Sequence, residues 1–303
     1  MTSPVYQLSD DYIERLAALD PGSATYMGIK GFDDKMTDFS PSGHAARAEL
    51  DSSTLTSLNK LEATDSADRL AAGVLREALE MNESDYVANE HLRSIRIIAG
   101  DVDAARSVFD LMPTDTAGDW ETIAGRLSQV PAAFDGMRES WSLGVSRGSV
   151  AQRRQVLAVS DQLKTWSGQH GNRGFFEQFV EGAQTVDGAP IEKLRSLAAD
   201  ASKALAKTAE YLEREYAPHA DDRDGVGPER HALARRRFMG MIVDAQDAYE
   251  WGTNEVLRLD AELSRTAREI KPGATLDEVR HELDNDPSKA VHGEEHLRNW
   301  LQE

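Results

Sequence analysis

Residues 190–216 read PIEKLRSLAADASKALAKTAEYLEREY and decide the fold class. Pro190 suits the first turn of a helix, because its fixed φ matches the helix and its missing N–H is not needed there. Apolar side chains then recur every three or four residues, which places them on one face of a helix. They are Ile191, Leu194, Leu197, Ala201, Leu205 and Leu212. The stretch therefore predicts a long amphipathic helix that ends near Tyr216 and Pro218.

The same spacing recurs along most of the chain and predicts further helices. Ser9 is placed to cap a first helix that carries Tyr12 and Leu16 on its apolar face. Pro131 is expected to kink a helix that runs over residues 120–141. Further helices are expected over residues 43–61, 70–87, 149–166, 229–270, 276–283 and 294–303.

Strand signals are almost missing from this pattern. Residues 93–98 show weak alternation, and no other stretch alternates convincingly. The sequence predicts an all-α fold, a large assembly of long helices with little or no sheet. We expect residues 1–303 to form a single helical region, with a hinge near residues 218–228, where polar residues interrupt the pattern.

Composition excludes several classes of function. The chain has 303 residues, 40% of them hydrophobic, which is enough to bury a sizeable core. Its net charge of −19 repels phosphate backbones and anionic lipids, so neither nucleic acid nor a membrane is expected as a partner. With no cysteine, disulfides and thiolate sites are ruled out. Residues 1–11 lack the pattern of a signal peptide, and the predicted location is cytoplasmic.

One stretch fits a metal motif, but poorly. His292 and His296 flank Glu295 in the order H-x-x-E-H, which one class of zinc peptidases uses. On a helix both imidazoles could reach a metal, with the glutamate as base. Gly293 is a poor interior helix residue, so the helix should begin after it and leave His292 outside. We therefore expect two exposed polar residues near a helix start, and no metal site.

The remaining polar motifs are weaker. His281 and Glu282 lack the second histidine of H-E-x-x-H, and we interpret them as a surface pair. Residues 220–231 resemble a calcium loop, but Ala220 and His231 occupy positions that need oxygen ligands. Residues 235–237 are three arginines, expected to pair with nearby carboxylates. Phosphate-binding glycine loops and nucleophile elbows are missing, so we predict no catalytic, cofactor-binding or metal residue in this chain.

Several segments, taken in order, resemble one known family. They are Asp20–Ile29, Phe39–Pro41, Asp224–Gly227 with Arg230, Arg237–Gly240, Ala248–Gly252, Lys271–Thr275, His292–Gly293 and Arg298–Glu303. Together they resemble the bacterial domain of unknown function 885 family, which is similar to helical zinc carboxypeptidases of the Taq type. The resemblance implies an N-terminal portion of a larger metallopeptidase-like fold. It carries no family ligand or catalytic residue onto any position here.

Two hypotheses about function follow from this resemblance. In the first, the chain is the helical portion of a carboxypeptidase-like protein, inactive alone, with zinc and a peptide substrate expected only where the C-terminal half is present. The unclosed apolar stripe of Leu297, Trp300 and Leu301 favours it. The aromatic loop from Tyr26 to Phe39 is then the first place to look for a groove wall. In the second, the chain is a self-standing helical binding or scaffold protein. Whether the chain is an enzyme, and in what oligomeric state it exists, the sequence leaves open.

Overall fold

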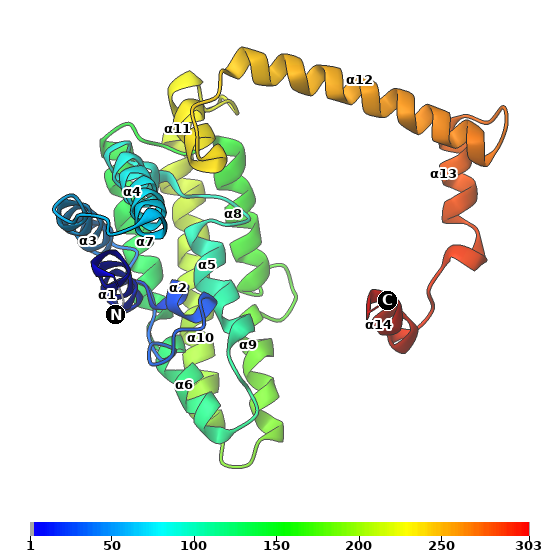
Figure 1. Cartoon of the computed structure of the whole chain (residues 1–303). Coiled ribbons are helices and arrows are strands. Elements are labelled where there is room, and N and C mark those ends of the chain that lie inside the picture. The colour runs from blue at the N-terminus through cyan, green and yellow to red at the C-terminus, as the bar shows by residue number, and fades with distance from the viewer. Residues whose placement is uncertain (1–2, 303) are drawn as a thin grey trace. The chain divides into compact units, whose positions relative to one another are not determined.

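The computed structural model describes residues 3–302, which form helices joined by turns and short loops (Figure 1). Within this range no β-strand occurs, and two residues, Gln152 and Asp221, form an isolated bridge. The predicted all-α fold is confirmed. The chain divides into two compact units, the first ending at Ala234 and the second beginning at Arg235.

The first unit holds most of the helices. Up to the predicted hinge segment they are α1 (Pro4–Leu19), α2 (Pro21–Tyr26), α3 (Pro41–Leu58), α4 (Ser66–Val87), η1 (Glu90–Arg93), α5 (Asp101–Ser107), η2 (Val108–Leu111), α6 (Ala117–Leu127), α7 (Val130–Ser146), α8 (Arg153–Trp166), α9 (Phe175–Phe179), η3 (Val180–Thr185), α10 (Ile191–Tyr211), η4 (Leu212–Tyr216) and η5 (Ala217–His219). They are followed by α11 (Pro228–Met239), α12 (Ala245–Ile270), α13 (Leu276–Asp284), η6 (Pro287–Lys289) and α14 (Glu294–Gln302).

The core is built around α10, which packs against α6, α7, α8 and α9 (Figure 1). Its predicted apolar stripe faces inward: Leu194, Ala201 and Leu205 are fully buried. Small alanines on the same face let neighbouring helices approach closely. Large aromatic side chains fill the space between the helices and are also fully buried, namely Phe109, Trp120, Phe134, Trp141 and Phe176. This rigid core holds the facing sides of α7 and α10 in place.

A smaller apolar cluster joins α1, α3 and α4 through Tyr12, Leu50 and Leu79. The hydroxyl of Tyr12 donates to Oδ1 of Asp51 at 2.7 Å, which satisfies a polar group inside the cluster. The loop before α3 lies directly on α7. There a Cβ on Gly136 would come within 2.8 Å of the backbone nitrogen of Ser40, so only glycine allows this contact.

The first helix begins earlier than predicted. α1 starts at Pro4, and its N-cap is Ser3, whose Oγ accepts from the backbone N–H of Tyr6 at 3.3 Å. Ser9 therefore lies inside the helix. The Ser-Pro pair at its start explains the difference, because serine is a strong N-cap and proline is favoured in the first turn.

The predicted kink at Pro131 was wrong. α6 ends at Leu127, and α7 begins at Val130 with Pro131 in its first turn. Proline here starts a new helix, where no intrahelical N–H is needed, and does not bend an existing one. The weak strand signal over residues 93–98 was also wrong, because Arg93 is the last residue of η1 and residues 94–98 form an irregular loop.

The long helix predicted over residues 229–270 is in fact two helices. α11 ends at Met239, and Gly240 adopts a positive φ of 64°, as glycines that end helices do. The second helix, α12, is capped by Asp244, which accepts from the backbone N–H groups of Gln246 and Asp247. These N–H groups, with the charge of Arg235, lower the pKa of Asp244. A glycine stop and an aspartate cap thus interrupt an unbroken apolar period.

Residues 220–230 are tied to the first unit by paired groups. The backbone N–H of Arg153 donates to the carbonyl of Asp221 at 2.8 Å, and Arg154 pairs with Asp224. Further on, Arg230 makes two parallel bonds to the carboxylate of Glu90, of 2.7 and 2.8 Å. Burial disfavours the charge on Glu90, yet these bonds hold its pKa below the usual value. Arg230 therefore anchors the start of α11.

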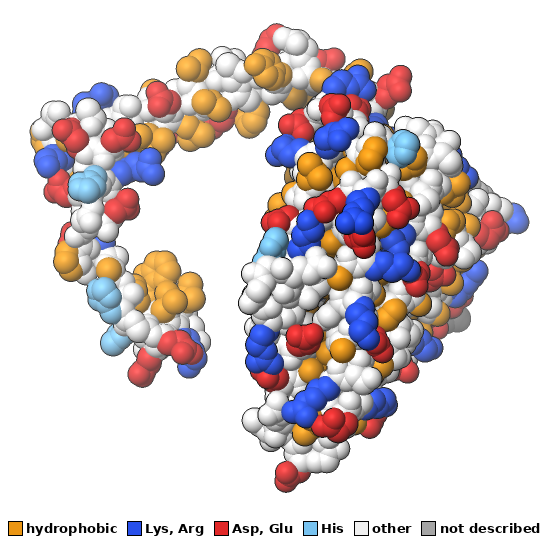
Figure 2. All heavy atoms as spheres, turned by 180° about the vertical axis from the view of Figure 1, so that it is seen from behind, with side chains coloured by type: hydrophobic (Ala, Val, Ile, Leu, Met, Phe, Trp, Pro, Cys, Tyr) orange, Lys and Arg blue, Asp and Glu red, His pale blue; other side chains and the backbone are white. Residues whose placement is uncertain are grey.

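The second unit has very little core of its own. Between residues 235 and 302, only Ala267 and Val279 are buried, where α12 meets α13. Large apolar side chains remain exposed along α12 and α14, as the orange atoms in Figure 2 show. Across residues 3–302, no helix is both long and apolar enough to cross a membrane.

Candidate functional site

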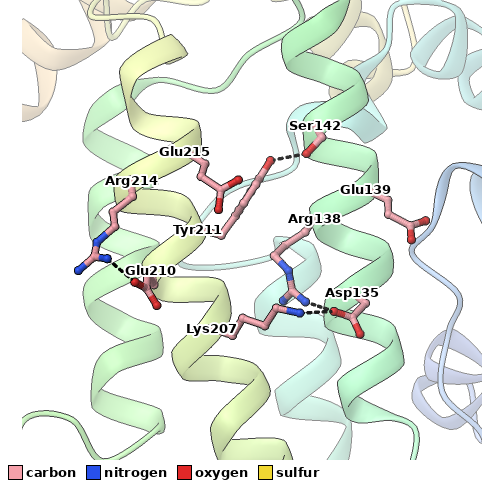
Figure 3. Close-up of a pocket in the computed structure, with 9 residues that line it drawn as sticks. All are labelled: Asp135, Arg138, Glu139, Ser142, Lys207, Glu210, Tyr211, Arg214 and Glu215. Atoms are coloured by element: carbon pink, nitrogen blue, oxygen red, sulfur yellow. Dashed lines mark hydrogen bonds and ion pairs between the residues drawn. The ribbon is translucent and has the colours of Figure 1, made fainter.

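A polar groove of about 1030 Å³ runs between α7 and the end of α10 (Figure 3). Its lining residues are Asp135, Arg138, Glu139, Ser142, Lys207, Glu210, Tyr211, Arg214 and Glu215. On each helix they are spaced by three or four residues, so each set forms one helical face. The opposite faces pack into the core. This site could not be predicted from the sequence, because its two halves lie some 70 residues apart.

Arg138 lies at the base of this groove and is 9% exposed. It donates to Asp135 on its own helix and to the hydroxyl of Thr208 on α10, which joins the two walls. Lys207 adds a second cation, with Nζ 3.3 Å from Asp135 Oδ1. Burial lowers the pKa of Arg138, while the negative charges nearby, including Glu215, act against that shift. The guanidinium is therefore a fixed donor inside the groove.

A π-helical turn, η4, forms one end of the groove. Such wide turns insert an extra residue into a helix and are frequent at functional sites. Here the turn presents Glu215 to the groove, while Tyr216 is fully buried in the core. Just before it, the hydroxyl of Tyr211 lies 2.8 Å from Ser142 Oγ, so these two hydroxyls cross the groove (Figure 3). Burial raises the pKa of Tyr211, which keeps its proton.

Two carboxylates in the groove lack a close partner. Glu210 pairs with Arg214 at 2.5 Å, and Asp135 is shared by Arg138 and Lys207. In contrast, Glu139 and Glu215 form no hydrogen bond or ion pair within the described part of the chain. The groove therefore offers hydroxyl and guanidinium donors together with two free acceptors. These groups can bind and orient a ligand, but they contain no nucleophile paired with a base.

The aromatic loop that was singled out from the sequence is pinned to α6 by a buried arginine. Arg126 is fully buried; its Nε donates to the carbonyl of Lys35 at 2.8 Å. Its Nη2 donates to Oγ1 of Thr25 at 2.7 Å and to the carbonyl of Phe32 at 3.2 Å. Fixed in this way, the loop cannot move freely over a substrate.

The three aromatic rings of that loop have different surroundings. Phe39 is buried in the core, and Phe32 lies half-buried under the ammonium group of Lys35. Tyr26 is 54% exposed, and its hydroxyl lies 2.5 Å from Ser107 Oγ. Only Tyr26 is thus available to a ligand. The prediction that this loop forms a groove wall remains a prediction.

The H-x-x-E-H stretch lies at the start of α14, which begins at Glu294 as expected. Gly293 has a φ of 87°, and His292 precedes it outside the helix. His296 uses Nδ1 to contact the carbonyl of His292 at 3.0 Å, so the two rings do not share a helical face. From residue 3 to residue 302, no group of three or more His, Asp or Glu side chains is arranged to hold a metal. His292, Glu295 and His296 therefore lack the geometry of the H-x-x-E-H zinc motif.

The other motifs are engaged in surface contacts. Glu282 pairs with Lys271 at 2.6 Å, next to His281. In the calcium-like segment, Asp222 and Asp224 pair with arginines of α8 at 2.5 and 3.0 Å. Their carboxylates are thus used in ion pairs at the surface.

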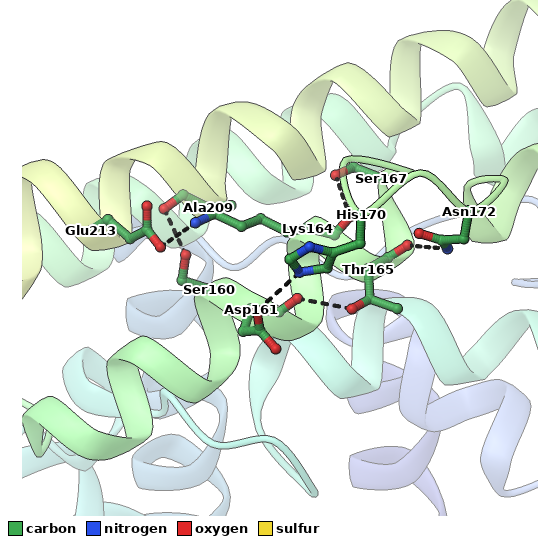
Figure 4. Close-up of polar contacts among 9 residues, drawn as sticks. All are labelled: Ser160, Asp161, Lys164, Thr165, Ser167, His170, Asn172, Ala209 and Glu213. Atoms are coloured by element: carbon green, nitrogen blue, oxygen red, sulfur yellow. Dashed lines mark hydrogen bonds and ion pairs between the residues drawn. The ribbon is translucent and has the colours of Figure 1, made fainter.

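A set of polar contacts also joins α8 to α10, η4 and the loop after α8 (Figure 4). Lys164 pairs with Glu213, and the hydroxyl of Ser160 donates to the backbone carbonyl of Ala209 at 3.0 Å. In the loop, His170 Nε2 lies 2.9 Å from Asp161 Oδ1. Within the described range no hydroxyl is hydrogen-bonded to the ring of His170, and the hydroxyl of Thr165 donates to the backbone carbonyl of Asp161, not to its carboxylate. We interpret the set as cross-links that fix the groove wall from behind.

Two histidines that sequence reasoning passed over meet inside the first unit. The rings of His44 on α3 and His91 in η1 have centroids 4.9 Å apart, and His91 also stacks on Tyr86. Nη2 of Arg47 lies 3.0 Å from His44 Nδ1. Burial, followed by the charge of Arg47, lowers the pKa of His44 to about 3. Burial, followed by the charges of Arg147 and Arg47, lowers that of His91 to about 4. Both rings are therefore neutral near pH 7.

The described residues 3–302 form an all-α fold with a polar groove between α7 and α10, and no group among them is arranged to hold a metal. Residues 21–303 match the family described as bacterial protein of unknown function (DUF885). The chain belongs to this family, which confirms the resemblance drawn from its segments. Among curated proteins, no sequence matches the chain.

Solved structures share the fold. A candidate lipoprotein from Colwellia psychrerythraea has a TM-score of 0.76 at 16% identity, with 100% of this chain and 57% of that chain covered. A candidate lipoprotein of unknown function from Shewanella oneidensis has a TM-score of 0.65 at 14% identity, with 96% of this chain and 54% of that chain covered. The chain thus spans little more than half the length of these proteins. The predicted cytoplasmic location is not tested by this similarity and stays a prediction.

Proposed function

We propose that the chain is the substrate-binding helical part of a peptidase-like protein, and that its polar groove binds an extended peptide with basic side chains. The observation that carries this proposal is the groove between α7 and α10 with its two unpartnered carboxylates, Glu139 and Glu215. Chemistry on the bound peptide would come from outside the described residues, which contain no fitting metal centre.

The groove chemistry matches what a peptide offers. Backbone carbonyls of an extended peptide need donors, and the side chains of Ser142, Tyr211 and Arg138 that line the groove can supply them. Lysine and arginine side chains need carboxylates, which Glu215 and Glu139 supply on opposite walls. The chain's net charge of −19 also draws a cationic ligand toward the surface. An acidic peptide would meet repulsion from the same two carboxylates.

Replacing Glu215 with Gln is expected to weaken binding of a labelled Lys-Ala hexapeptide about three- to tenfold. The change removes one charge that faces the ligand, and a partly exposed ion pair contributes about 1 kcal/mol. Fluorescence anisotropy at low salt measures the dissociation constant. A Glu-Ala hexapeptide of equal length should bind more weakly to the unchanged protein.

Glu192→Gln is the matched control, because Glu192 is exposed on α10 outside the groove and pairs with Arg195. It removes the same charge and should leave peptide affinity unchanged. Thermal melting of both variants checks that the fold is intact. Equal affinity of Glu215→Gln and the unchanged protein, or no preference for the basic peptide, would remove the basis for the proposal.

A further inference from the structure

Apolar side chains recur at seven-residue intervals along α12. Tyr249, Val256, Leu263 and Ile270 are 73%, 66%, 52% and 55% exposed. Leu259 lies between two of them, three residues after Val256, and is 44% exposed. We call these five residues the α12 seam. Spacings of seven, three and four residues are those by which one helix packs its side chains into the gaps of another.

The contacts within the second unit leave most of this seam exposed. α13 packs against α12 at Ala267, which lies between Leu263 and Ile270 on the seam face, so this contact borders only the C-terminal end of the seam. α14 presents apolar residues of its own, with Trp300 and Leu301 exposed by 60% and 70%. A helix of 26 residues is about 39 Å long, so the seam runs over most of that length. Trp251 and Leu257 are also exposed, but each lies about 120° around the helix from the seam and is not part of it.

The flank of the seam is acidic. Glu255, Glu262 and Glu269 follow one edge at the same seven-residue spacing, and the other edge carries Asp260. The glutamates also pair within the helix with Arg258 and Arg265, which lie farther from the seam. A partner helix that places Lys or Arg beside its own apolar seam would gain attraction along this edge.

A second copy of the chain does not fit this pattern. In a parallel pair of α12 helices, Glu255 of one copy would face Asp260 of the other, and in an antiparallel pair the glutamate rows would face each other. Like charges opposite each other disfavour both arrangements. An anionic membrane surface is disfavoured by the same acidic edge, because interfacial helices carry basic polar faces.

We propose that the α12 seam binds a helix with a basic flank, supplied by the part of the family fold that this chain does not span. This chain covers 57% and 54% of the two related structures, and the remainder of that shared fold is the source that we propose for the partner helix. The partner helix carries apolar residues at matching seven-residue spacing, with Lys or Arg on the side that meets the glutamate row. This proposal does not depend on the peptide groove, and its failure leaves that proposal untouched.

The test uses the full chain and a synthetic 28-residue helical peptide, four heptads long, with Leu and Ile at the seam positions and Lys beside them. Isothermal titration should show one-to-one binding. A peptide with Glu beside the same seam should bind at least tenfold more weakly. A peptide with the same lysines but Gln in place of the apolar residues should not bind, which separates the seam from general attraction to an acidic protein.

Leu263→Glu in the chain should weaken binding of the basic peptide at least tenfold. Ala261→Glu adds the same side chain on the opposite, exposed face of α12 and should change affinity less than twofold. Equal binding of the basic and acidic peptides, or equal effects of the two substitutions, would overturn the proposal. So would a dimer in sedimentation, or binding to phosphatidylserine vesicles, that is present in the unchanged chain and lost in Leu263→Glu.

Discussion

Replacing Arg126 with Met is expected to reduce the free energy of unfolding by about 3–5 kcal/mol, because several acceptors lose one buried charged donor at once. The guanidinium is fully buried and donates to the carbonyls of Lys35 and Phe32 and to the hydroxyl of Thr25. Methionine keeps most of the length of the side chain but donates nothing. The oxygen atoms left behind then lose their partners away from water, at about 1–3 kcal/mol each.

Thermal and urea unfolding of the full chain measure this change, and a melting temperature about 10 °C lower is expected from the size of the first unit. Arg195→Met is the control. Arg195 is exposed and pairs only with Glu192, so its removal should alter stability by less than about 0.5 kcal/mol. A melting temperature of Arg126→Met close to that of the control would show that the loop before α3 is held by other contacts.

Acid is expected to destabilise the protein through His44 and His91 well before the carboxylates lose their charge. Their pKa values are lowered to about 3 and about 4 in the folded state, whereas an unfolded histidine titrates near 6.5. Below pH 6.5 the unfolded chain therefore binds protons that the folded protein does not. Stability contributed by the two neutral rings is present above pH 6.5 and falls as the pH is lowered toward 4. The loss is on the order of 5 kcal/mol for the pair.

Urea unfolding at pH 7, 6, 5 and 4 measures the slope of the free energy of unfolding against pH. The variants His44→Gln and His91→Gln should each flatten it, because each removes one proton-binding difference. His170→Gln changes an exposed histidine and should leave the slope as it is. If all three variants keep the slope of the unchanged protein, the buried pair is not its source.

Burial sets the direction of both pKa shifts, and the charges around the pair change their size. Arg47 and Arg147 oppose protonation of the rings, whereas Glu90 favours it on His91, and Asp38 and Asp20 favour it on His44.

Asp101 acts in the opposite direction. Burial raises its pKa to about 6, so between pH 6 and its unfolded value of 3.8 the folded state binds the extra proton. The protonation of Asp101 therefore increases stability as the pH falls. The free energy of unfolding will depend less steeply on pH than the two histidines alone would make it.

The sequence predicts local structure well where short-range signals agree. The α10 stripe, the start of α14 after Gly293 and the end of α12 at Lys271 all follow from spacing and capping rules. Errors arose where two signals competed within a few residues. Gly240 and Asp244 interrupt a continuous apolar period. Because Gly240 ends α11 and Asp244 caps α12, this stretch forms two helices where the apolar spacing predicted one.

The candidate site could not be predicted in the same way. Arg138 meets Thr208 from 70 positions away, and Arg126 meets Lys35 from 91 positions away. Nothing around either arginine distinguishes it from an exposed arginine on an amphipathic helix. Only the packing of α7 and α6 against distant elements turns these side chains inward, and spacing along one helix carries no information about that packing.

The extra residue in η4 lets one continuous helical segment line the groove and also contact the segment that precedes α8. A regular helix would advance each side chain by about 100°, whereas the wide turn shifts the register once. Because of that shift, Glu215 can point to the groove while the hydroxyl of Tyr216 accepts from the backbone N–H of Ala151, two residues before α8. Deleting a single residue there would rotate everything after it and cost Tyr216 its partner. Among relatives, length changes in this turn should therefore accompany loss of the tyrosine.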